Sequence, residues 1–338
     1  MMNYEEFKQK VQNEFKNYLG EEYKDATVII REVTKVNKQV DQMSLINLPE
    51  NDFASPSISV QNIYDNYERT GDFQGVMESL GESFREAMQN FEKSPLHKGL
   101  DFSKVDENII FTLVNAEQNK ELLENVPHRE FEDLAIVYRW NVGTDSNGLY
   151  TNIITNEFAE KIGKSEPELY ELAKENTNRI FPSEVRNMAE VIGEIIFGED
   201  GEYMPEDEEF KNMMNETPDE KSMYVITNKA RLFGAAAMLY EDNLHDLSQQ
   251  IDSDLYILPS SVHEVIAISD KFGDADELAD MVYEVNMEQV SIEERLSNQV
   301  YHYDKEARTL RLATDKFDRK ISDDIQDKTH QIEEGKAR

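Results

Sequence analysis

The chain of 338 residues contains no cysteine. This absence excludes disulfide bonds, thiolate metal sites and cysteine nucleophiles, and it is typical of proteins that work in the reducing cytoplasm. The sequence also lacks any apolar run of roughly 18 residues, the length that a membrane-spanning helix needs. The opening segment, MMNYEEFKQKVQNEF, is charged and amphipathic and lacks the apolar stretch of a signal peptide. We therefore expect a cytoplasmic protein without a membrane span.

Basic residues are scarce, since 35 Lys and Arg stand against 70 Asp and Glu, and the formal net charge is −35. Nucleic-acid affinity comes mainly from Lys and Arg that displace counterions from phosphates. The charge therefore argues against direct binding to nucleic acid or to an anionic membrane. It favours a protein partner, in particular a basic one, or divalent cations. Alternatively, the charge serves only to keep the protein soluble.

Several sequence motifs that indicate a particular catalytic or binding function are missing. No Gly-x-x-x-x-Gly-Lys-Ser/Thr phosphate loop, no Gly-x-Gly-x-x-Gly after a strand and no Gly-x-Ser-x-Gly nucleophile elbow occurs in the chain. Loops centred on Gly148 or Gly201 lack the oxygen ligands that an EF-hand needs. We therefore expect no bound cofactor.

Hydrophobic residues make up 39% of the chain, which is enough for a folded core. Runs of β-branched and aromatic residues predict strands at 27–33, 43–48, 109–114, 134–142, 149–154, 223–227, 255–258, 262–268, 300–303 and 309–312. Helical spacing predicts helices at 4–18, before Gly71, at 73–91, after the capping box Ser165–Glu168, from about 183, at 232–240 and at 276–286.

These strands come in short pairs without a regular β-α-β rhythm. The pattern predicts an α+β fold of short antiparallel strand pairs with packed helices, and not a doubly wound parallel sheet. The acidic stretch 199–209 suggests a break in the chain. We predict an N-terminal α+β domain at 1–197, an acidic loop or linker at 198–222, a C-terminal α+β domain at 223–313 and a charged, helical tail at 314–338.

The stretch LPSSVHEVI gathers the side chains of nucleophilic catalysis: Ser260, Ser261, His263 and Glu264. A hydrolase could use either serine with His263 as its base. On a strand, Ser261 and His263 would share one face and Glu264 would point to the other, so a different acid would have to orient the imidazole. The alternative interpretation is a turn that leads into a core strand, with the histidine hydrogen-bonded locally.

Two further patterns bear on metal binding. His263 and Glu264 begin like the zinc motif His-Glu-x-x-His, but residue 267 is alanine. His128 and Glu132 are four residues apart and would share one face of a helix, where they could help to hold a metal ion. The alternative is a turn and a short helix with paired charges. Because no second histidine lies nearby, we expect no metal site.

Long segments of the chain resemble a known family. They include MNYEEFKQKV, ISVQNIYDNYERTG, LVNAEQNKELLENVPHREFEDLAIVYRW, DLYILPSSVHEVI and VYHYDKEARTL. In order and in content they are similar to the domain-of-unknown-function family numbered 5688, which is common in anaerobic gut bacteria related to clostridia. The resemblance covers roughly residues 2–313 and implies no activity, cofactor or site. From the residues, we expect an acidic, non-enzymatic protein-interaction or regulatory module. The alternative is a hydrolase that uses Ser260 or Ser261 with His263.

Overall fold

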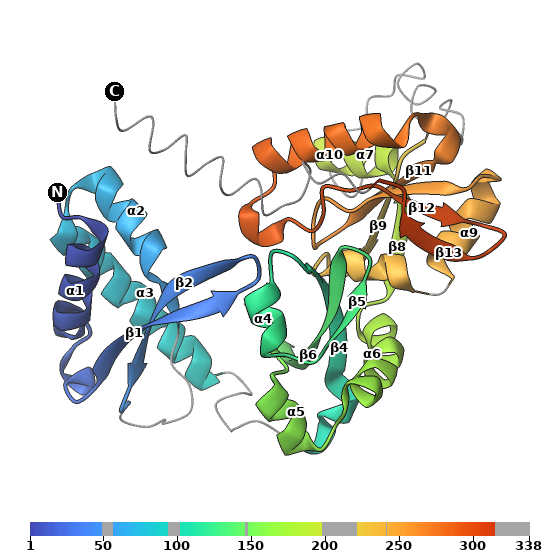
Figure 1. The fold of residues 1–338 in the computed structure, drawn as a ribbon. Coiled ribbons are helices and arrows are strands. Elements are labelled where there is room, and N and C mark those ends of the chain that lie inside the picture. The colour runs from blue at the N-terminus through green and yellow to red at the C-terminus, as the bar shows by residue number, and fades with distance from the viewer. Residues whose placement is uncertain (49–56, 94–101, 146–147, 198–221, 241, 315–338) are drawn as a thin grey trace. The chain divides into compact units, whose positions relative to one another are not determined.

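The computed structural model describes residues 1–48, 57–93, 102–145, 148–197, 222–240 and 242–314 (Figure 1). Contacts divide the chain into two compact units. Unit 1 comprises Met1–Ser103 with Val142–Tyr150, and unit 2 comprises Lys104–Asn141 with Thr151–Arg338. The division therefore falls far from the linker predicted at 198–222. That linker and the predicted tail lie almost wholly outside the described residues.

Unit 1 packs three helices on one antiparallel sheet. Its elements are α1 (Tyr4–Glu14), β1 (Thr27–Lys35), β2 (Lys38–Ile46), β3 (Ile58–Ser59), α2 (Val60–Thr70) and α3 (Phe73–Lys93). The predicted opening helix ends earlier than expected, because residues 15–18 form a 3-10 turn. The strands predicted at 27–33 and 43–48 form a hairpin: β1 and β2 pair along their whole length around Asn37, which has the positive φ that such turns need.

In the described residues, the strands of unit 2 form two sheets. The four-stranded sheet contains β4 (Ile109–Asn115), β5 (His128–Phe131), β6 (Leu134–Asp145) and β7 (Gly148–Ile153), with β6 between β4 and β5 and with β7 also paired to β6. Residues 142–145 of β6 and 148–150 of β7 are assigned to unit 1. Its helices are α4 (Lys120–Glu124), α5 (Asn156–Ile162) and α6 (Glu166–Ile180). The capping box predicted at the start of α6 is confirmed: Ser165 and Glu168 bond to each other's backbone.

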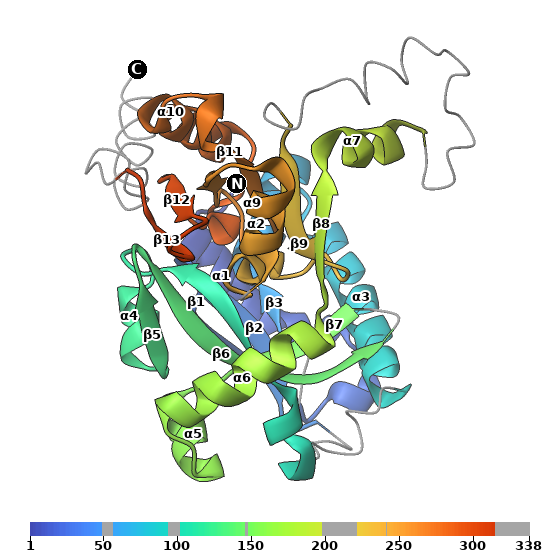
Figure 2. The ribbon, with the colours of Figure 1, turned by 90° about the vertical axis from the view of Figure 1, so that its right-hand side faces the viewer.

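The six-stranded sheet runs in the order β13-β12-β10-β11-β9-β8, and all its neighbours are antiparallel. Its strands are β8 (Ser183–Asn187), β9 (Tyr224–Asn228), β10 (Leu255–Leu258), β11 (Val265–Ser269), β12 (Tyr301–Asp304) and β13 (Thr309–Leu312). The associated helices are α7 (Met188–Phe197), α9 (Asn243–Ile251) and α10 (Ala275–Glu288). β8 lies at one edge of the sheet and leads straight into α7 (Figure 2).

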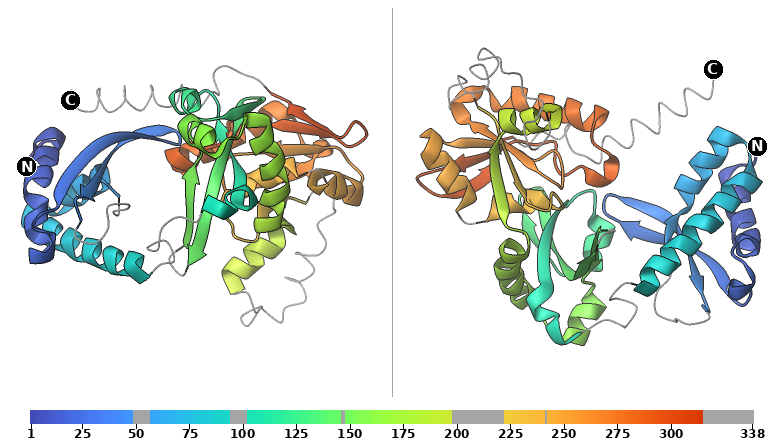
Figure 3. Two further views of the ribbon diagram at one scale, coloured as in Figure 1. Left: turned by 90° about the horizontal axis from the view of Figure 1, so that it is seen from below. Right: turned by 180° about the vertical axis from the view of Figure 1, so that it is seen from behind.

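Both α7 and α10 lie on the same side of the six-stranded sheet (Figures 1 and 3). Leu278, Ala279 and Val282 of α10 pack on Leu258 and Ile268 of the central strands. Directly opposed residues of neighbouring strands point to the same face, so the register places Arg186 of β8 on this face too. This face carries the hollow described below.

The α+β prediction is confirmed, while three local predictions are wrong. The segment from 183 is a strand before it becomes a helix, because residues 183–187 pair with β9. Residues 234–239 form a 3-10 helix instead of the α-helix predicted at 232–240. β11 starts at Val265, three residues later than predicted, because residues 262–264 turn toward η9 (Ile292–Glu294) and the Val262 N–H bonds to the Glu294 carbonyl. Within the described residues, no helix has the length and apolarity to cross a membrane.

Candidate binding site

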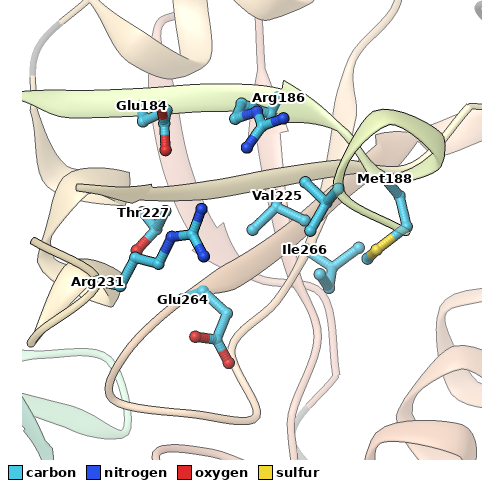
Figure 4. A pocket seen from close by; sticks show the side chains of 9 residues that line it. Glu184, Arg186, Met188, Val225, Thr227, Arg231, Glu264 and Ile266 are labelled. Atoms are coloured by element: carbon cyan, nitrogen blue, oxygen red, sulfur yellow. The ribbon is translucent and has the colours of Figure 1, made fainter. Parts of the chain in front are cut away.

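A hollow of about 290 Å³ opens on the face of the sheet formed by β8, β9 and β11 (Figure 4). We call it the sheet hollow. It is lined by Glu184, Arg186, Met188, Val191, Val225, Thr227, Arg231, Glu264 and Ile266. The floor follows from the strand register, because Arg186 lies opposite Val225 and Val225 lies opposite Ile266. An apolar floor with a few charged groups at its edge is typical of a binding surface.

Two arginines converge on the sheet hollow, one from β8 and one from the turn after β9 (Figure 4). The guanidinium of Arg186 donates two hydrogen bonds to Glu194 of α7, one of them 2.7 Å long from Nη1 to Oε2. The Nη2 atom of Arg231 lies 4.0 Å from the same carboxylate. Hydrogen bonding from Arg186 lowers the pKa of Glu194, so this carboxylate is ionised at neutral pH. The pair holds α7 against β8 beside the sheet hollow.

The outer side of α7 is apolar and exposed. Its exposed side chains are Ile192 at 45%, Ile195 at 77% and Ile196 at 60% of their full accessible surface. Isolated apolar residues are common on protein surfaces, but a cluster of large ones marks an interaction surface. We call these three residues the isoleucine patch. It borders the sheet hollow, since Met188 and Val191 of the same helix line that hollow.

The predicted catalytic histidine lies on the loop before β11. The Nδ1 atom of His263 accepts a hydrogen bond from the Phe233 N–H at 3.4 Å, and its ring stacks on the Phe233 ring. Its Nε2 atom lies 3.6 Å from Glu294 Oε1. An acid therefore does lie behind His263, and it is Glu294 rather than the adjacent Glu264. Both ring nitrogens face groups other than a serine.

Ser261 is buried and turned toward the backbone. Its hydroxyl oxygen accepts a hydrogen bond from the His263 backbone N–H at 3.0 Å, and the residue forms a β-bridge with Arg295. The neighbouring Ser260 uses its carbonyl to accept the Leu296 N–H. The hydroxyl of Ser261 thus closes a local turn and does not bond to the imidazole. The arrangement does not place a serine, His263 and an acid in the line that proton transfer needs.

Glu264 is the one predicted catalytic candidate that lines the sheet hollow. It lies beside β11 on the same face as Thr227 and Ile266, while His263 contacts Phe233 and Glu294. Arg186, Arg231 and Glu194 were not predicted as site residues, because helical spacing from 183 onward concealed strand β8. The available signal was a pair of basic residues, Arg186 within β8 and Arg231 in the turn after β9.

His128 and Glu132 do not form the predicted helical pair. His128 begins strand β5, where its Nδ1 atom lies 3.1 Å from the Val126 carbonyl. Glu132 follows the strand with a φ of 55° and its Oε1 atom lies 3.5 Å from Arg311 Nη1. In the described part of the chain, the group of side chains able to hold a metal ion is instead Asp254, Asp270 and His302.

Comparison with known proteins gives one relationship. No curated protein matches the chain, and no solved structure matches it. A family model described as a family of unknown function (DUF5688) matches residues 4–305. The matched range includes every strand and helix described here except β13, and it contains both the sheet hollow and the isoleucine patch. The chain therefore belongs to the family of unknown function DUF5688.

Proposed function

We propose that this protein is a non-enzymatic interaction module of the cytoplasm that binds a partner protein through the isoleucine patch and the sheet hollow. The observation that carries the proposal is the exposure of Ile192, Ile195 and Ile196 on one helix. Exposed apolar side chains beside a hollow stabilise an interface, because their burial releases about 25 cal/mol per Å² of apolar surface.

The charges around this surface favour a partner with basic residues. Glu184 and Glu264 line the sheet hollow, and Glu194 already neutralises much of the charge on Arg186. The whole chain carries a formal net charge of −35. Such a field attracts a cationic partner and speeds its encounter, and the effect weakens as salt is added. An apolar segment flanked by Lys or Arg fits this surface best.

The absence of cysteine allows a direct test. An Ile195→Cys variant has a single thiol, to which benzophenone is attached before the protein is returned to a lysate of its source cells. Illumination should produce one discrete adduct with a different protein. The yield should fall when about 0.5 M NaCl is added, because screening weakens the charge attraction. The adduct should also weaken in an Ile192→Asp, Ile195→Cys double variant.

The matched control is an Ile46→Cys variant. Ile46 of β2 is 41% exposed and lies in unit 1, away from the isoleucine patch in sequence. It should give no discrete adduct. Equal adducts from both positions, no adduct from Ile195→Cys, or an adduct of two copies of this chain would each contradict the proposal.

A further inference from the structure

Three metal-ligating side chains meet at the end of the six-stranded sheet, on strands that are neighbours in space. Asp254 immediately precedes β10, Asp270 immediately follows β11 and His302 belongs to β12. Leu255 pairs with Ser269, and Tyr256 pairs with both Ile268 and His302. The Asp270 N–H also bonds to the Asp254 carbonyl at 3.0 Å. Regular strand pairing therefore fixes the backbones of all three residues.

Each carboxylate is oriented through one of its two oxygens. Ser253 Oγ donates to Asp270 Oδ1 at 2.7 Å, and the Lys305 backbone N–H donates to Asp254 Oδ1 at 3.1 Å. The other oxygens face one imidazole nitrogen: the Oδ2 atoms of Asp254 and Asp270 lie 3.6 Å and 4.0 Å from His302 Nε2. Partners of this kind, which orient ligands from behind, are characteristic of metal sites.

The spacing suits an ion better than direct contact between the side chains. Hydrogen bonds between nitrogen and oxygen are usually about 2.7–3.2 Å long, so both oxygens are too far from Nε2 for good ones. A zinc ion about 2.0–2.2 Å from each ligand, in tetrahedral geometry, would hold its ligand atoms about 3.4 Å apart. The three ligand atoms here lie within 4.8 Å of one another. Small side-chain rotations would therefore close the site around a cation.

The electrostatics also favour a cation. Two carboxylates at directly neighbouring ends of paired strands repel each other unless a positive charge lies between them. The side chains of all three residues are about one-third exposed, so an ion can enter without unfolding the sheet. Imidazole combined with carboxylates suits Zn²⁺ and Mn²⁺ better than Mg²⁺, which prefers oxygen ligands and water.

We propose that Asp254, Asp270 and His302 form a binding site for a divalent transition-metal ion. Three protein ligands leave at least one coordination position for water or for a ligand's donor atom. The site is independent of the proposed interaction surface, since none of its residues lines the sheet hollow.

The test is titration calorimetry of the EDTA-treated full-length protein with ZnCl₂ and separately with MgCl₂. One Zn²⁺ should bind per chain far more tightly than Mg²⁺. His302→Gln and Asp270→Asn should each weaken Zn²⁺ binding about 100-fold. Ser253→Ala removes an orienting partner of Asp270 but no metal ligand, and it should weaken Zn²⁺ binding about tenfold. Asp274→Asn and His128→Gln serve as matched controls and should leave the affinity unchanged. Circular dichroism confirms that each variant is folded.

A spectroscopic readout separates ligation from a general attraction of cations to an acidic chain. In the Mn²⁺-loaded protein, pulsed electron paramagnetic resonance should detect one imidazole nitrogen coupled to the ion, and His302→Gln should remove that signal. Weak binding of several ions per chain that no variant changes would overturn the proposal. So would a nitrogen coupling that survives in His302→Gln.

Discussion

Glu166 is a single residue that ties two strands to a helix. It occupies the first turn of α6, and its carboxylate accepts hydrogen bonds from Arg129 Nε and Nη2 at 3.1 Å and 3.2 Å. It also accepts a short hydrogen bond from the Tyr138 hydroxyl. The Arg129 guanidinium lies 3.7 Å from the centre of the Tyr170 ring, which adds a cation–π contact. Strands β5 and β6 and helix α6 therefore meet at one negative charge.

This junction predicts a loss of stability in acid. Burial alone would raise the pKa of Glu166, but hydrogen bonds from Arg129 and Tyr138 outweigh it and lower the pKa below its ordinary value of 4.5. A carboxylate with a lowered pKa in the folded state stabilises that state above its unfolded pKa, and this stability is lost as the pH falls through the folded value. Urea unfolding between pH 7 and pH 3 should show this decline, and Glu166→Gln should reduce it.

At pH 7, Glu166→Gln should lower the free energy of unfolding by about 1–3 kcal/mol, because Arg129 loses its charged partner. Glu171→Gln on the exposed side of the same helix is the control and should change it by less than about 0.5 kcal/mol. If both variants lose the same stability and keep the same pH dependence, the junction at Glu166 does not contribute as described.

At the scale of elements, Gly234 allows the 3-10 helix to approach β9 and the loop before β11. A Cβ atom at this position would lie 2.1 Å from Thr227 Oγ1 and 2.3 Å from the His263 carbonyl oxygen. These two groups are themselves joined, since Thr227 Oγ1 donates to the His263 oxygen at 2.8 Å. The contact fixes the loop that carries the predicted histidine and lies beside the sheet hollow.

Gly234→Ala should therefore lower the free energy of unfolding by about 1–3 kcal/mol, since backbone and hydrogen-bonded atoms must shift to make room. Gly273→Ala is the matched control, because a Cβ there meets nothing within 4 Å and its backbone is extended. Chemical denaturation of both variants gives the comparison. A change at Gly234 no larger than that at Gly273 would show that the packing is looser than the structure indicates.

At the scale of the whole molecule, unit 1 has a core of its own. Phe7 is fully buried, and its ring contacts those of Tyr64, Tyr67 and Phe73 at centroid distances of 5.1–5.7 Å. The buried residues clustered with Phe7 all lie between residues 7 and 88. A defect in this core should therefore act on unit 1 first.

Phe7→Ala should destabilise unit 1 by about 3–5 kcal/mol, because a large buried ring is lost. Amide hydrogen exchange should quicken in residues 1–48 and 57–93, while β10, β11 and β12 keep their protection. Val33→Ala, at a position that is 39% exposed, should leave both units unchanged. Faster exchange throughout the chain in Phe7→Ala would mean that the two units unfold as one.

The net charge of −35 predicts a second property of the whole molecule. Self-repulsion opposes the compact state, and salt screens it. Raising NaCl from about 0.02 M to about 0.5 M should therefore increase the melting temperature, as measured by differential scanning calorimetry. A decrease would indicate that favourable ion pairs, such as Lys8 with Asp41 at 2.6 Å, outweigh the repulsion.

The features predicted correctly from the sequence depend on residues close together in the chain. The hairpin of β1 and β2 and the capping box at Ser165 are each formed by residues that lie within about 20 positions of one another in the chain. Short-range hydrogen bonds and local side-chain spacing determine such elements. The prediction for residues 183–187 was wrong because it, too, depended on neighbouring residues alone. The apolar residues there continue the helical spacing of α7, which predicted a single helix. Pairing with β9, some 40 residues away, made that segment a strand.

The amino-acid sequence by itself determined the α+β class, the strong negative charge, the lack of thiol chemistry and the membership of DUF5688. Only the tertiary structure decided which side chains meet. It placed Glu294 behind His263 and turned Ser261 toward the backbone. It also assembled the sheet hollow and brought Asp254, Asp270 and His302 together. These sites depend on the register between strands distant in the chain, and that register is set by packing of the whole sheet.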